Sequence, residues 1–432
     1  MKITGIKRWI LLAVISAFSG TMVVTPYLRC NYYDQIVMLF TQCRQICDPL
    51  CVNEYIGDLA LIFGCITTVM YILGGALVDK FGEKIMLVLG GVLMAGGSIL
   101  FGLVLSSASM AVAFILFGFG TGTMWGGYLK LTRKLGSSEE QGRMYSTSEF
   151  VRGITGTVLG FAGVAILNHA VLPSGLTDPA VIGEKWRMLL FIHAGIYILC
   201  VILCLVLIPK NVMGNEESET DEGEAFTLKG AAEVLKLPGT WLTAAILFFG
   251  WSISTCTGGY LGAYTSNVIG ISAAQASTFA IIRNYVISAI STLLIGYAAI
   301  KFKSESKTIG VYGFATAILL VCMLLCAGNR TLCIAVTFVL AAAYTGMRGL
   351  YFAVASEVKI PVRLTGVATG IISFIGYLPD AYFAKLAGRW LDRYGLKGYD
   401  YIWFWAIACA VLGGIVCFIT ARYAKKLKGS TV

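Results

Sequence analysis

Charged residues are scarce in this sequence: Asp, Glu, Lys and Arg make up only 13% of its 432 residues. A soluble protein carries about 25% charged residues, so this shortage argues against a soluble globular fold. Apolar residues amount to 57%, and the mean hydropathy is +0.80. The composition therefore predicts a membrane protein whose main surroundings are the lipid bilayer.

Histidine is also rare. His169 and His193 are the only two, and we expect both to be packing or loop residues rather than proton carriers. The sequence contains no nucleophile–base pair and no metal-ligand pattern of the kind that an active site needs. We therefore predict no enzymatic activity, no cofactor and no metal site. The net charge is +10, but the basic residues lie at the ends of apolar segments, so no nucleic-acid partner is expected.

Long apolar segments, by contrast, are abundant. Windows of about 20 apolar residues predict transmembrane helices. We expect twelve, near residues 8–40, 53–77, 85–105, 110–130, 146–168, 187–208, 240–267, 274–299, 308–327, 332–354, 365–391 and 401–423. The first run is longer than a signal peptide and has no clear cleavage site, so we expect it to be the first span.

The basic residues orient these spans. Most Lys and Arg fall in the two termini and in the loops on the same side as the termini, whereas the opposite loops hold five: Arg44, Lys185, Arg330, Arg393 and Lys397. By the positive-inside rule, both termini are predicted to lie in the cytoplasm. The expected location is the cell (inner) membrane, with many passes.

A long polar segment divides the spans into two groups of six. Its centre reads NEESETDEGEAF, which is too acidic and too poor in apolar residues to fold on its own. We therefore predict an N-terminal bundle at 1–208, a cytoplasmic linker at 209–239 and a C-terminal bundle at 240–432. Matching residues recur at an offset of about 220: Gly75, Lys80, Phe81, Gly126 and Arg143 correspond to Gly296, Lys301, Phe302, Gly346 and Arg363. Weak internal symmetry of this kind is typical of transporters.

Residues 75–84 read GALVDKFGEK and resemble the loop between helices 2 and 3 of the major facilitator superfamily, whose pattern is G-x-L-x-D-[RK]-x-G-[RK]-[RK]. The matching positions are Gly75, Leu77, Asp79, Lys80, Gly82 and Lys84, whereas Glu83 departs from a usually basic position. The resemblance implies an all-α membrane protein of twelve transmembrane helices in two pseudo-symmetric six-helix bundles. It also implies that this loop latches the two halves when the cytoplasmic side is closed. The residues expected to serve gating are Gly75, Asp79, Lys80, Gly82, Arg143, Arg152 and Arg348.

Arg29 lies in the first span, within PYLRCNYYD. The Tyr-x-Arg-x-Asn pattern resembles the organophosphate/inorganic phosphate antiporters, which hold a phosphate with an Arg on helix 1, but their partner Arg on helix 7 is missing here. Arg29 has two open interpretations: it snorkels at the outer interface, or it contacts substrate. The residues expected to bind substrate are Arg29, Tyr33, Trp125, Tyr260, Tyr264, Arg283 and Tyr377.

Carboxylates at membrane depth are costly, so each is a functional candidate. Asp380 is the first candidate for proton coupling, and Asp34 and Glu149 come next. Each has a structural alternative. Asp380 could serve as a counter-ion to Lys385 or to an Arg, and Asp34 could pair with Arg29.

Two further charged residues have alternatives that are near in sequence. Glu149 could form a capping box with Ser146 and pair with Arg152 three residues later. Arg348 either lines the cavity or pairs with Glu357 as a gate.

Cys43, Cys47 and Cys51 recur every four residues in the segment expected outside the membrane. A helix would place them on one face, although Asp48-Pro49 interrupts it. A disulfide and a metal site are both open interpretations, and no His accompanies the three cysteines.

The missing motifs narrow the function. The sequence lacks the Gly-Pro-x-x-Gly-Gly pattern of drug/proton antiporters and the P-E-S-P-R segment of sugar porters, and it looks most like poorly characterised bacterial members. We predict a monomeric secondary transporter for a small anionic organic solute, coupled to a proton or a counter-anion. The alternatives are a neutral solute, or a transporter-like sensor, which should carry an added cytoplasmic domain.

Overall fold

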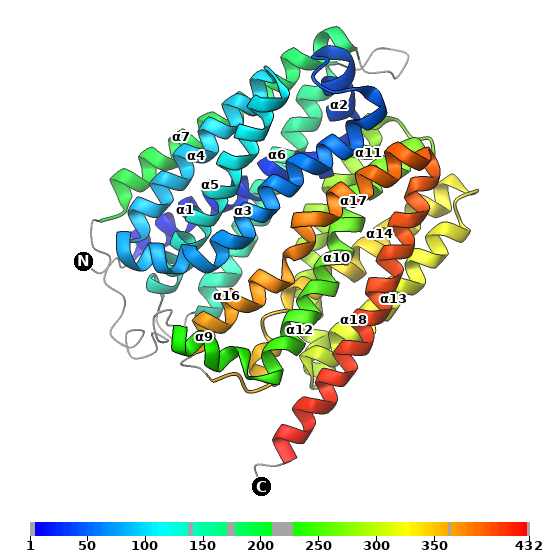
Figure 1. Cartoon of the computed structure of the whole chain (residues 1–432). Coiled ribbons are helices and arrows are strands. Elements are labelled where there is room, and N and C mark those ends of the chain that lie inside the picture. Colours follow the sequence, from blue (N-terminus) through cyan, green and yellow to red (C-terminus); the bar gives the residue numbers. More distant parts are fainter. Residues whose placement is uncertain (1–4, 137–140, 171–177, 210–227, 362–363, 430–432) are drawn as a thin grey trace.

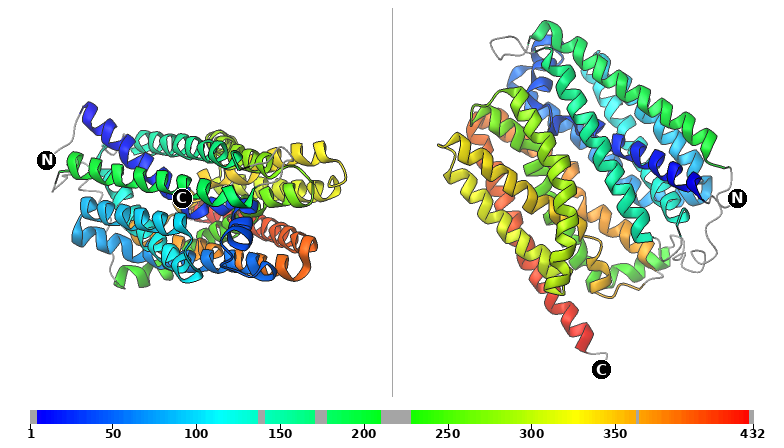
Figure 2. Two further views of the ribbon diagram at one scale, coloured as in Figure 1. Left: turned by 90° about the horizontal axis from the view of Figure 1, so that it is seen from above. Right: turned by 180° about the vertical axis from the view of Figure 1, so that it is seen from behind.

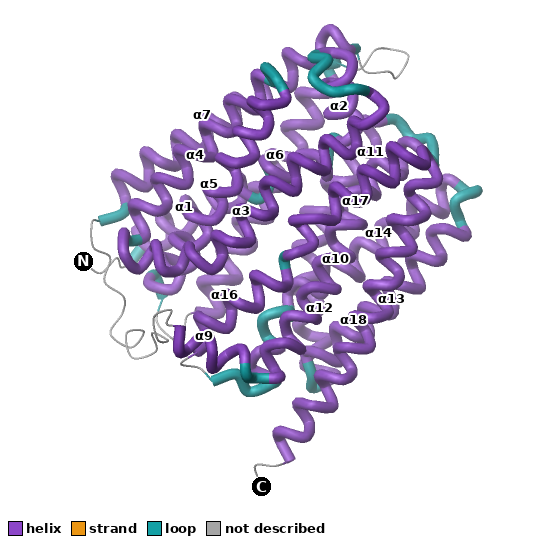
Figure 3. The backbone as a smooth tube through the Cα atoms, viewed as in Figure 1, coloured by secondary structure: helices purple, strands orange, loops and turns teal. Residues whose placement is uncertain are grey.

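The computed structural model describes residues 5–136, 141–170, 178–209, 228–361 and 364–429. All regular structure in these ranges is helical, without a strand (Figure 3). A bundle of helices is the simplest way to satisfy every backbone hydrogen bond inside a bilayer. The composition and the fold therefore agree.

The N-terminal bundle fills the upper left of Figure 1 in blue to green. Its elements are α1 (Ile6–Met22), η1 (Thr25–Cys30), α2 (Tyr33–Met38), η2 (Leu39–Cys43), η3 (Pro49–Cys51), α3 (Val52–Phe81), α4 (Glu83–Leu103), α5 (Ser107–Lys134), α6 (Gln141–Asn168) and α7 (Pro179–Leu207).

The C-terminal bundle occupies the lower right of the same view. Helix α9 (Leu228–Leu235) precedes the bundle within the segment 209–239. The bundle's elements are α10 (Pro238–Asn267), α11 (Ala273–Ile281), η5 (Ile282–Ile287), α12 (Ser288–Phe302), α13 (Glu305–Leu325), α14 (Arg330–Gly346), η6 (Met347–Gly349), α15 (Val354–Glu357), α16 (Thr365–Gly376), α17 (Leu378–Tyr394), η8 (Gly395–Lys397) and α18 (Gly398–Gly429).

Ten stretches of the described residues are long and apolar enough to cross a membrane. The last of them, Val367–Leu427, contains two of the expected spans, because α17 passes into α18 through the short η8 turn. The expected first span, near 8–40, is not among the ten because its helix is broken. Together with this broken segment, the ten stretches account for the twelve expected spans.

The break in the first span corrects the prediction of one long helix. α1 ends at Met22, Pro26 opens η1, and Tyr27 has non-helical backbone angles (φ −102°, ψ 17°). Proline lacks the N–H that would continue a helix. The Thr25 hydroxyl, buried at the break, lies 2.9 Å from Nδ1 of His193 and 3.0 Å from the Tyr197 hydroxyl. Two side chains of α7 therefore hold the break in place.

Helix α1 begins and α18 ends toward the same end of the helix bundles, the end at which α9 lies (Figure 1). We call this the inner end, and we call the opposite end, which carries α2 and the start of α3, the outer end. Figure 2, which views the molecule from above and from behind, shows the two bundles side by side along their length. Each membrane-spanning helix therefore runs between the inner end and the outer end.

Between the bundles, α3 packs along α17. Glycines permit this approach: a Cβ at Gly57 or Gly388 would overlap the backbone of the facing helix, at Lys385 and at Asn53 respectively. A Cβ at Gly64 would meet the carbonyl of Asp380. Small residues let membrane helices approach closely and gain packing contacts. This close contact runs from the outer end to the middle of the molecule.

The loop between α3 and α4 has the glycine turn that its motif predicts. Gly82 has φ 81°, a left-handed conformation that favours glycine. Lys84 donates to the carbonyls of Leu205 and Ile208, each at 2.7 Å, and so caps the end of α7. The unusual Glu83 pairs with Lys134 of α5 at 2.7 Å. This ion pair is a physical reason for an acidic residue at a position that is usually basic.

The latch prediction itself is not tested by these contacts. Gly75, Asp79 and Arg143 fall outside the residues whose side chains are described. Lys80 is exposed, and its Nζ lies 5.4 Å from the ring centroid of Phe81.

Candidate functional site

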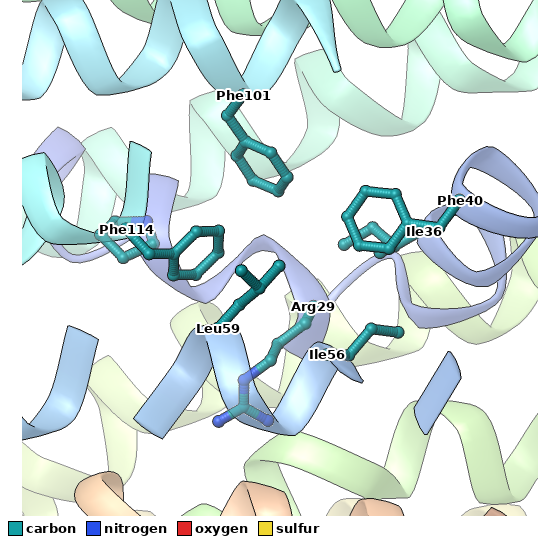
Figure 4. A pocket seen from close by; sticks show the side chains of 8 residues that line it. Arg29, Ile36, Phe40, Ile56, Leu59, Phe101 and Phe114 are labelled. Atoms are coloured by element: carbon teal, nitrogen blue, oxygen red, sulfur yellow. The ribbon is translucent and has the colours of Figure 1, made fainter. Parts of the chain in front are cut away.

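Arg29 projects from η1 toward the other bundle. Its stem lies among the apolar side chains of Leu59, Phe101 and Phe114, and its guanidinium group points away from them (Figure 4). The residue is 7% exposed, which rules out snorkelling at the outer interface. Its guanidinium carbon lies 6.0 Å from the ring centroid of Tyr260 on α10. Its Nη1 atom is buried and has no hydrogen-bond partner among the described residues.

Asp380 faces the same region from the first turn of α17. Pro379 stands just before it, and Tyr377, with φ −93° and ψ 5°, separates α17 from α16. The Tyr27 hydroxyl donates to Oδ2 of Asp380 at 3.0 Å, whereas the buried Oδ1 forms no full hydrogen bond with any described residue. Asp380 interacts electrostatically with Arg29 and with Arg348.

Lys385 is not the counter-ion of Asp380, as one interpretation proposed. Its Nζ lies 2.5 Å from Oδ1 of Asp58 on α3. More than one helical turn of α17 separates the two residues, so the Asp380 carboxylate and the Lys385 ammonium group have different partners.

Arg348 reaches the same region from η6. Its guanidinium carbon lies 5.2 Å from the ring centroid of Trp251 on α10, and its Nε has no hydrogen-bond partner. The pairing of Arg348 with Glu357 does not occur. Glu357 instead accepts from the Ser304 hydroxyl at 2.5 Å and from the Ser306 backbone N–H at 2.8 Å. Its carboxylate thus stabilises the start of α13, where a negative charge is favoured.

Aromatic rings complete this region. The Trp251 ring meets the Tyr377 ring edge-on, with centroids 4.7 Å apart, and Tyr377 packs against Tyr71 of α3 at 5.4 Å. Trp251 also lies beside Asp380, and its indole N–H interacts with that carboxylate without forming a full hydrogen bond to any described residue. We call the following residues the central polar cluster: Tyr27, Arg29, Trp251, Tyr260, Arg348, Tyr377 and Asp380.

The cluster contains an unusual number of unsatisfied polar atoms. Nη1 of Arg29, Nε1 of Trp251, Nε of Arg348 and Oδ1 of Asp380 are all buried without a partner among the described residues. Buried polar groups in proteins nearly always have hydrogen-bond partners. The cluster gathers donors and one acceptor from both bundles in one place, which is the arrangement that a polar ligand needs.

Some expected substrate residues lie elsewhere. Arg283 is 1% exposed inside the C-terminal bundle, where its Nη1 donates to the Thr337 hydroxyl at 3.1 Å. Tyr264 packs edge-on against Trp403 at 5.2 Å. Neither contacts the central polar cluster through a described bond or ring contact.

Tyr33 lies next to the cluster. Its ring centroid is 5.7 Å from that of Tyr260, and its hydroxyl donates to Asn53 at 2.8 Å.

Arg152 and Glu149 form the expected local ion pair, which confirms that part of the structural interpretation. Glu149 is 61% exposed. The Arg152 guanidinium lies 5.1 Å from the Trp125 ring centroid, so Trp125 is covered by Arg152. The side chain of Ser146 falls outside the description, and the capping box stays a prediction.

At the outer end, the two bundles are joined by bonds that the sequence analysis did not predict. Asp392 of α17 accepts from the backbone N–H of Asn53 at 3.2 Å, from its Nδ2 at 2.7 Å and from the N–H of Glu54 at 2.7 Å. Arg389 pairs with Glu54 at 2.8 Å. Spacing could have suggested a shared face, because residues 385, 389 and 392 fall on one side of a helix.

The first span adds further bonds between the bundles at the outer end. We call these bonds, together with those of Asp392 and Arg389, the outer closure. Asp34 accepts from the Ser266 hydroxyl at 2.5 Å and from Asn267 at 3.2 Å, both on α10. It therefore does not serve Arg29, contrary to one alternative. Asn31 donates to the Tyr285 hydroxyl at 3.1 Å and accepts from Asn284 at 3.2 Å. The two bundles are thus bonded together from the centre to the outer end.

A family model described as the Major Facilitator Superfamily matches residues 10–384. The chain belongs to the major facilitator superfamily. It is a secondary transporter rather than an enzyme, and the predicted fold is confirmed.

Two curated relatives come from Escherichia coli K12. The chain is 26% identical to the inner membrane protein YqcE over 98% of this chain and 97% of that protein. It is 27% identical to the inner membrane protein YihN over 95% and 94%. A crystal structure of a D-xylose-proton symporter superposes with a TM-score of 0.73 at 14% identity, covering 96% of this chain and 98% of that one. At this identity the superposition shows the fold alone.

Proposed function

We propose that this transporter moves a small anionic organic solute, which binds in the central polar cluster between the two bundles. The observation that carries the proposal is the arrangement of Arg29 and Arg348 around Asp380. One arginine comes from each bundle, so a ligand held by both would join the halves at their centre. Transporters with this fold rock two bundles around such a site.

The charges favour an anion over a neutral solute. Two guanidinium groups and one carboxylate leave an excess of one positive charge in the cluster. A buried cation without a partner costs several kcal/mol, and a carboxylate, sulfonate or phosphate group would offset that cost with bidentate hydrogen bonds. The tyrosine and tryptophan rings supply apolar faces for the rest of the solute.

Asp380 is the proposed coupling residue. It is the one carboxylate of the cluster, and its Oδ1 atom lacks a full hydrogen bond to the described residues, although Trp251 lies beside it. A proton on Asp380 would raise the net charge of the cluster by one and would strengthen its attraction for an anion. Proton and substrate binding would then be linked. Asp34 has described partners at the outer end, and Glu149 is largely exposed, so both are weaker candidates.

The orientation and location are also proposals. The distribution of Lys and Arg supports a cytoplasmic inner end. The names of the two relatives support the inner membrane. We further propose that residues 1–208 and 240–432 move as two units joined by the segment 209–239, and that one chain suffices, because both arginines of the cluster belong to the same chain.

Uptake into proteoliposomes tests the function directly. The panel should contain matched pairs of solutes, each an organic acid and its neutral amide or alcohol, with and without a pH gradient. We expect uptake of an acid and not of its neutral counterpart, and faster uptake when the side facing the outer end is acidic. Equal uptake of both members of each pair would refute the anion proposal.

A further inference from the structure

Cys47 and Cys51 stand at the outer end, immediately before α3. Asp48 lies between them and builds a tight turn: its Oδ1 accepts from the Leu50 N–H at 2.9 Å, and its carbonyl accepts from the Cys51 N–H at 3.1 Å. Pro49 follows it as the first residue of η3. The turn reverses the chain within five residues, so the two cysteines are brought together by local structure alone.

The two sulfur atoms lie side by side. Both thiols donate to the carbonyl of Asp48, Cys47 at 3.4 Å and Cys51 at 3.6 Å, and they are close enough to hydrogen-bond to each other. Cys51 is exposed, whereas Cys47 is half-buried. An oxidant therefore reaches the Cys51 sulfur first, and the Cys47 sulfur is in position to react next.

The third cysteine of the series is directed elsewhere. Cys43 lies against α7, where its sulfur would be only 2.7 Å from a Cβ placed at Gly183. The described residues also contain no group of His, Cys, Asp and Glu that could hold a metal ion. Of the three pairings that the sequence leaves open, the geometry supports one.

We propose that Cys47 and Cys51 form an intramolecular disulfide on the outer face of the protein. The oxidant is a disulfide compound in the compartment outside the membrane, where disulfides form and persist. The Cys51 thiolate attacks this disulfide and releases one thiol of the oxidant, forming a mixed disulfide. The Cys47 thiolate then attacks the Cys51 sulfur and releases the second thiol. The two cysteines lose two electrons and two protons, and the oxidant gains them.

The bond would close a ring directly before the outer closure. Asn53 and Glu54, whose backbone N–H groups bind Asp392, follow Cys51 by two and three residues. Burial, followed by the neighbouring Cys51 thiol, raises the pKa of the Cys47 thiol to about 12. Because the thiolate fraction below the pKa rises about tenfold per pH unit, the second step should accelerate by about that factor between pH 7 and 8.

The proposal rests on the proposed orientation but not on the identity of the substrate, since neither thiol belongs to the central polar cluster. Right-side-out membrane vesicles should be treated with a membrane-impermeant maleimide, with and without prior reduction, and digested with trypsin for mass spectrometry. Cleavage after Arg44 separates Cys43 from the pair. The peptide of residues 45–80 also carries Cys65, so fragment masses assign the bond to its two cysteines. We expect the unreduced peptide to be lighter by two hydrogens and unlabelled at Cys47 and Cys51, and the reduced peptide to be labelled at Cys51.

Two matched variants complete the test. Cys51→Ser should leave Cys47 as a free thiol that labels after denaturation, whereas Cys43→Ser should leave the disulfide unchanged. Maleimide labelling of Cys51 without prior reduction would overturn the proposal while leaving the orientation intact. Failure of Cys51 to label even after reduction would overturn the orientation on which it rests.

Discussion

The two halves of α17 differ in how their charges are satisfied. In the outer half, Lys385, Arg389 and Asp392 each have a partner on α3. In the first turn of the same helix, one buried oxygen of Asp380 lacks a full hydrogen bond among the described residues. The glycine contacts with α3 run past both regions, so helix packing does not explain the difference.

The outer contact between α3 and α17 is thus a surface on which the two bundles bind each other. The central polar cluster is a surface that is suited to bind a solute. Where α17 faces α3 at the outer end, the surfaces are complementary: Lys385 and Arg389 each meet a carboxylate, and Asp392 meets the N-terminus of α3. In the central polar cluster, by contrast, a nitrogen of each arginine has no partner among the described residues, and the Trp251 indole N–H and Oδ1 of Asp380 lack a full hydrogen bond although the two side chains lie together. A transporter needs both kinds of surface, one that closes and one that holds the solute.

The largest effect is expected at Asp380. Asp380→Asn keeps the size of the side chain but cannot take up a proton, so concentrative uptake driven by a pH gradient should be lost. Exchange of substrate between the two sides should persist, because the excess positive charge of the cluster increases. The measurement is uptake and counterflow in proteoliposomes over a range of pH. Asp34→Asn is the control and should retain the pH dependence; a proton-driven Asp380→Asn protein would place coupling elsewhere.

Arg29→Lys should weaken substrate binding about 10- to 100-fold although the charge is kept. An ammonium group lacks the planar fork of a guanidinium group, and hydrogen bonds to charged groups contribute about 1.5–3 kcal/mol each. Binding can be measured by isothermal titration of detergent-solubilised protein with the substrate found in the panel. Arg283→Lys is the matched control, since Arg283 contacts Thr337 and Phe338 and should change affinity much less. Equal losses of affinity in both variants would show that Arg29 does not contact the substrate specifically.

The sequence predicted the spans because hydropathy is a local property, and it predicted the glycine turn at Gly82 because a motif is local too. It did not predict the break in the first span, although Pro26 was visible. Where a helix breaks also depends on contacts with other spans, here those of the Thr25 hydroxyl with His193 and Tyr197, about 170 residues away.

The central polar cluster was only partly predictable for the same reason. Arg29, Tyr260, Tyr377 and Asp380 were singled out because ionisable and aromatic residues within spans are unusual. Tyr264, one turn after Tyr260, was included by spacing, yet it packs against Trp403. The pairing of Arg348 with Glu357 was suggested by closeness in sequence, whereas Ser304 and Ser306 bind that carboxylate. Contacts between distant spans decide such cases.

Gly64→Leu should weaken the outer closure and increase the rate of Cys30 labelling from outside about tenfold. A Cβ at this position already meets the carbonyl of Asp380, and forcing extra atoms into a packed contact costs about 1–3 kcal/mol. We expect α3 and α17 to separate and the population with an open outer end to increase. The measurement is the rate at which an impermeant maleimide, added outside, labels the half-buried Cys30 near the centre. Gly195→Leu, at an exposed position with no atom near the added Cβ, should leave this rate unchanged.

The smallest effects are expected from single outer charges, and their order tests the comparison most finely. Asp392→Asn removes a carboxylate that accepts three hydrogen bonds at the N-terminus of α3, where a negative charge also interacts favourably with the helix dipole. It should increase Cys30 labelling severalfold. Arg389→Gln breaks an ion pair whose side chains are 59% and 28% exposed, and such pairs are weak and screened by salt. Its effect should stay below about threefold and vanish in high salt, whereas the effect of Asp392→Asn should persist. If Arg389→Gln opened the outer end more than Asp392→Asn, the more exposed ion pair rather than the half-buried Asp392 would hold the bundles together.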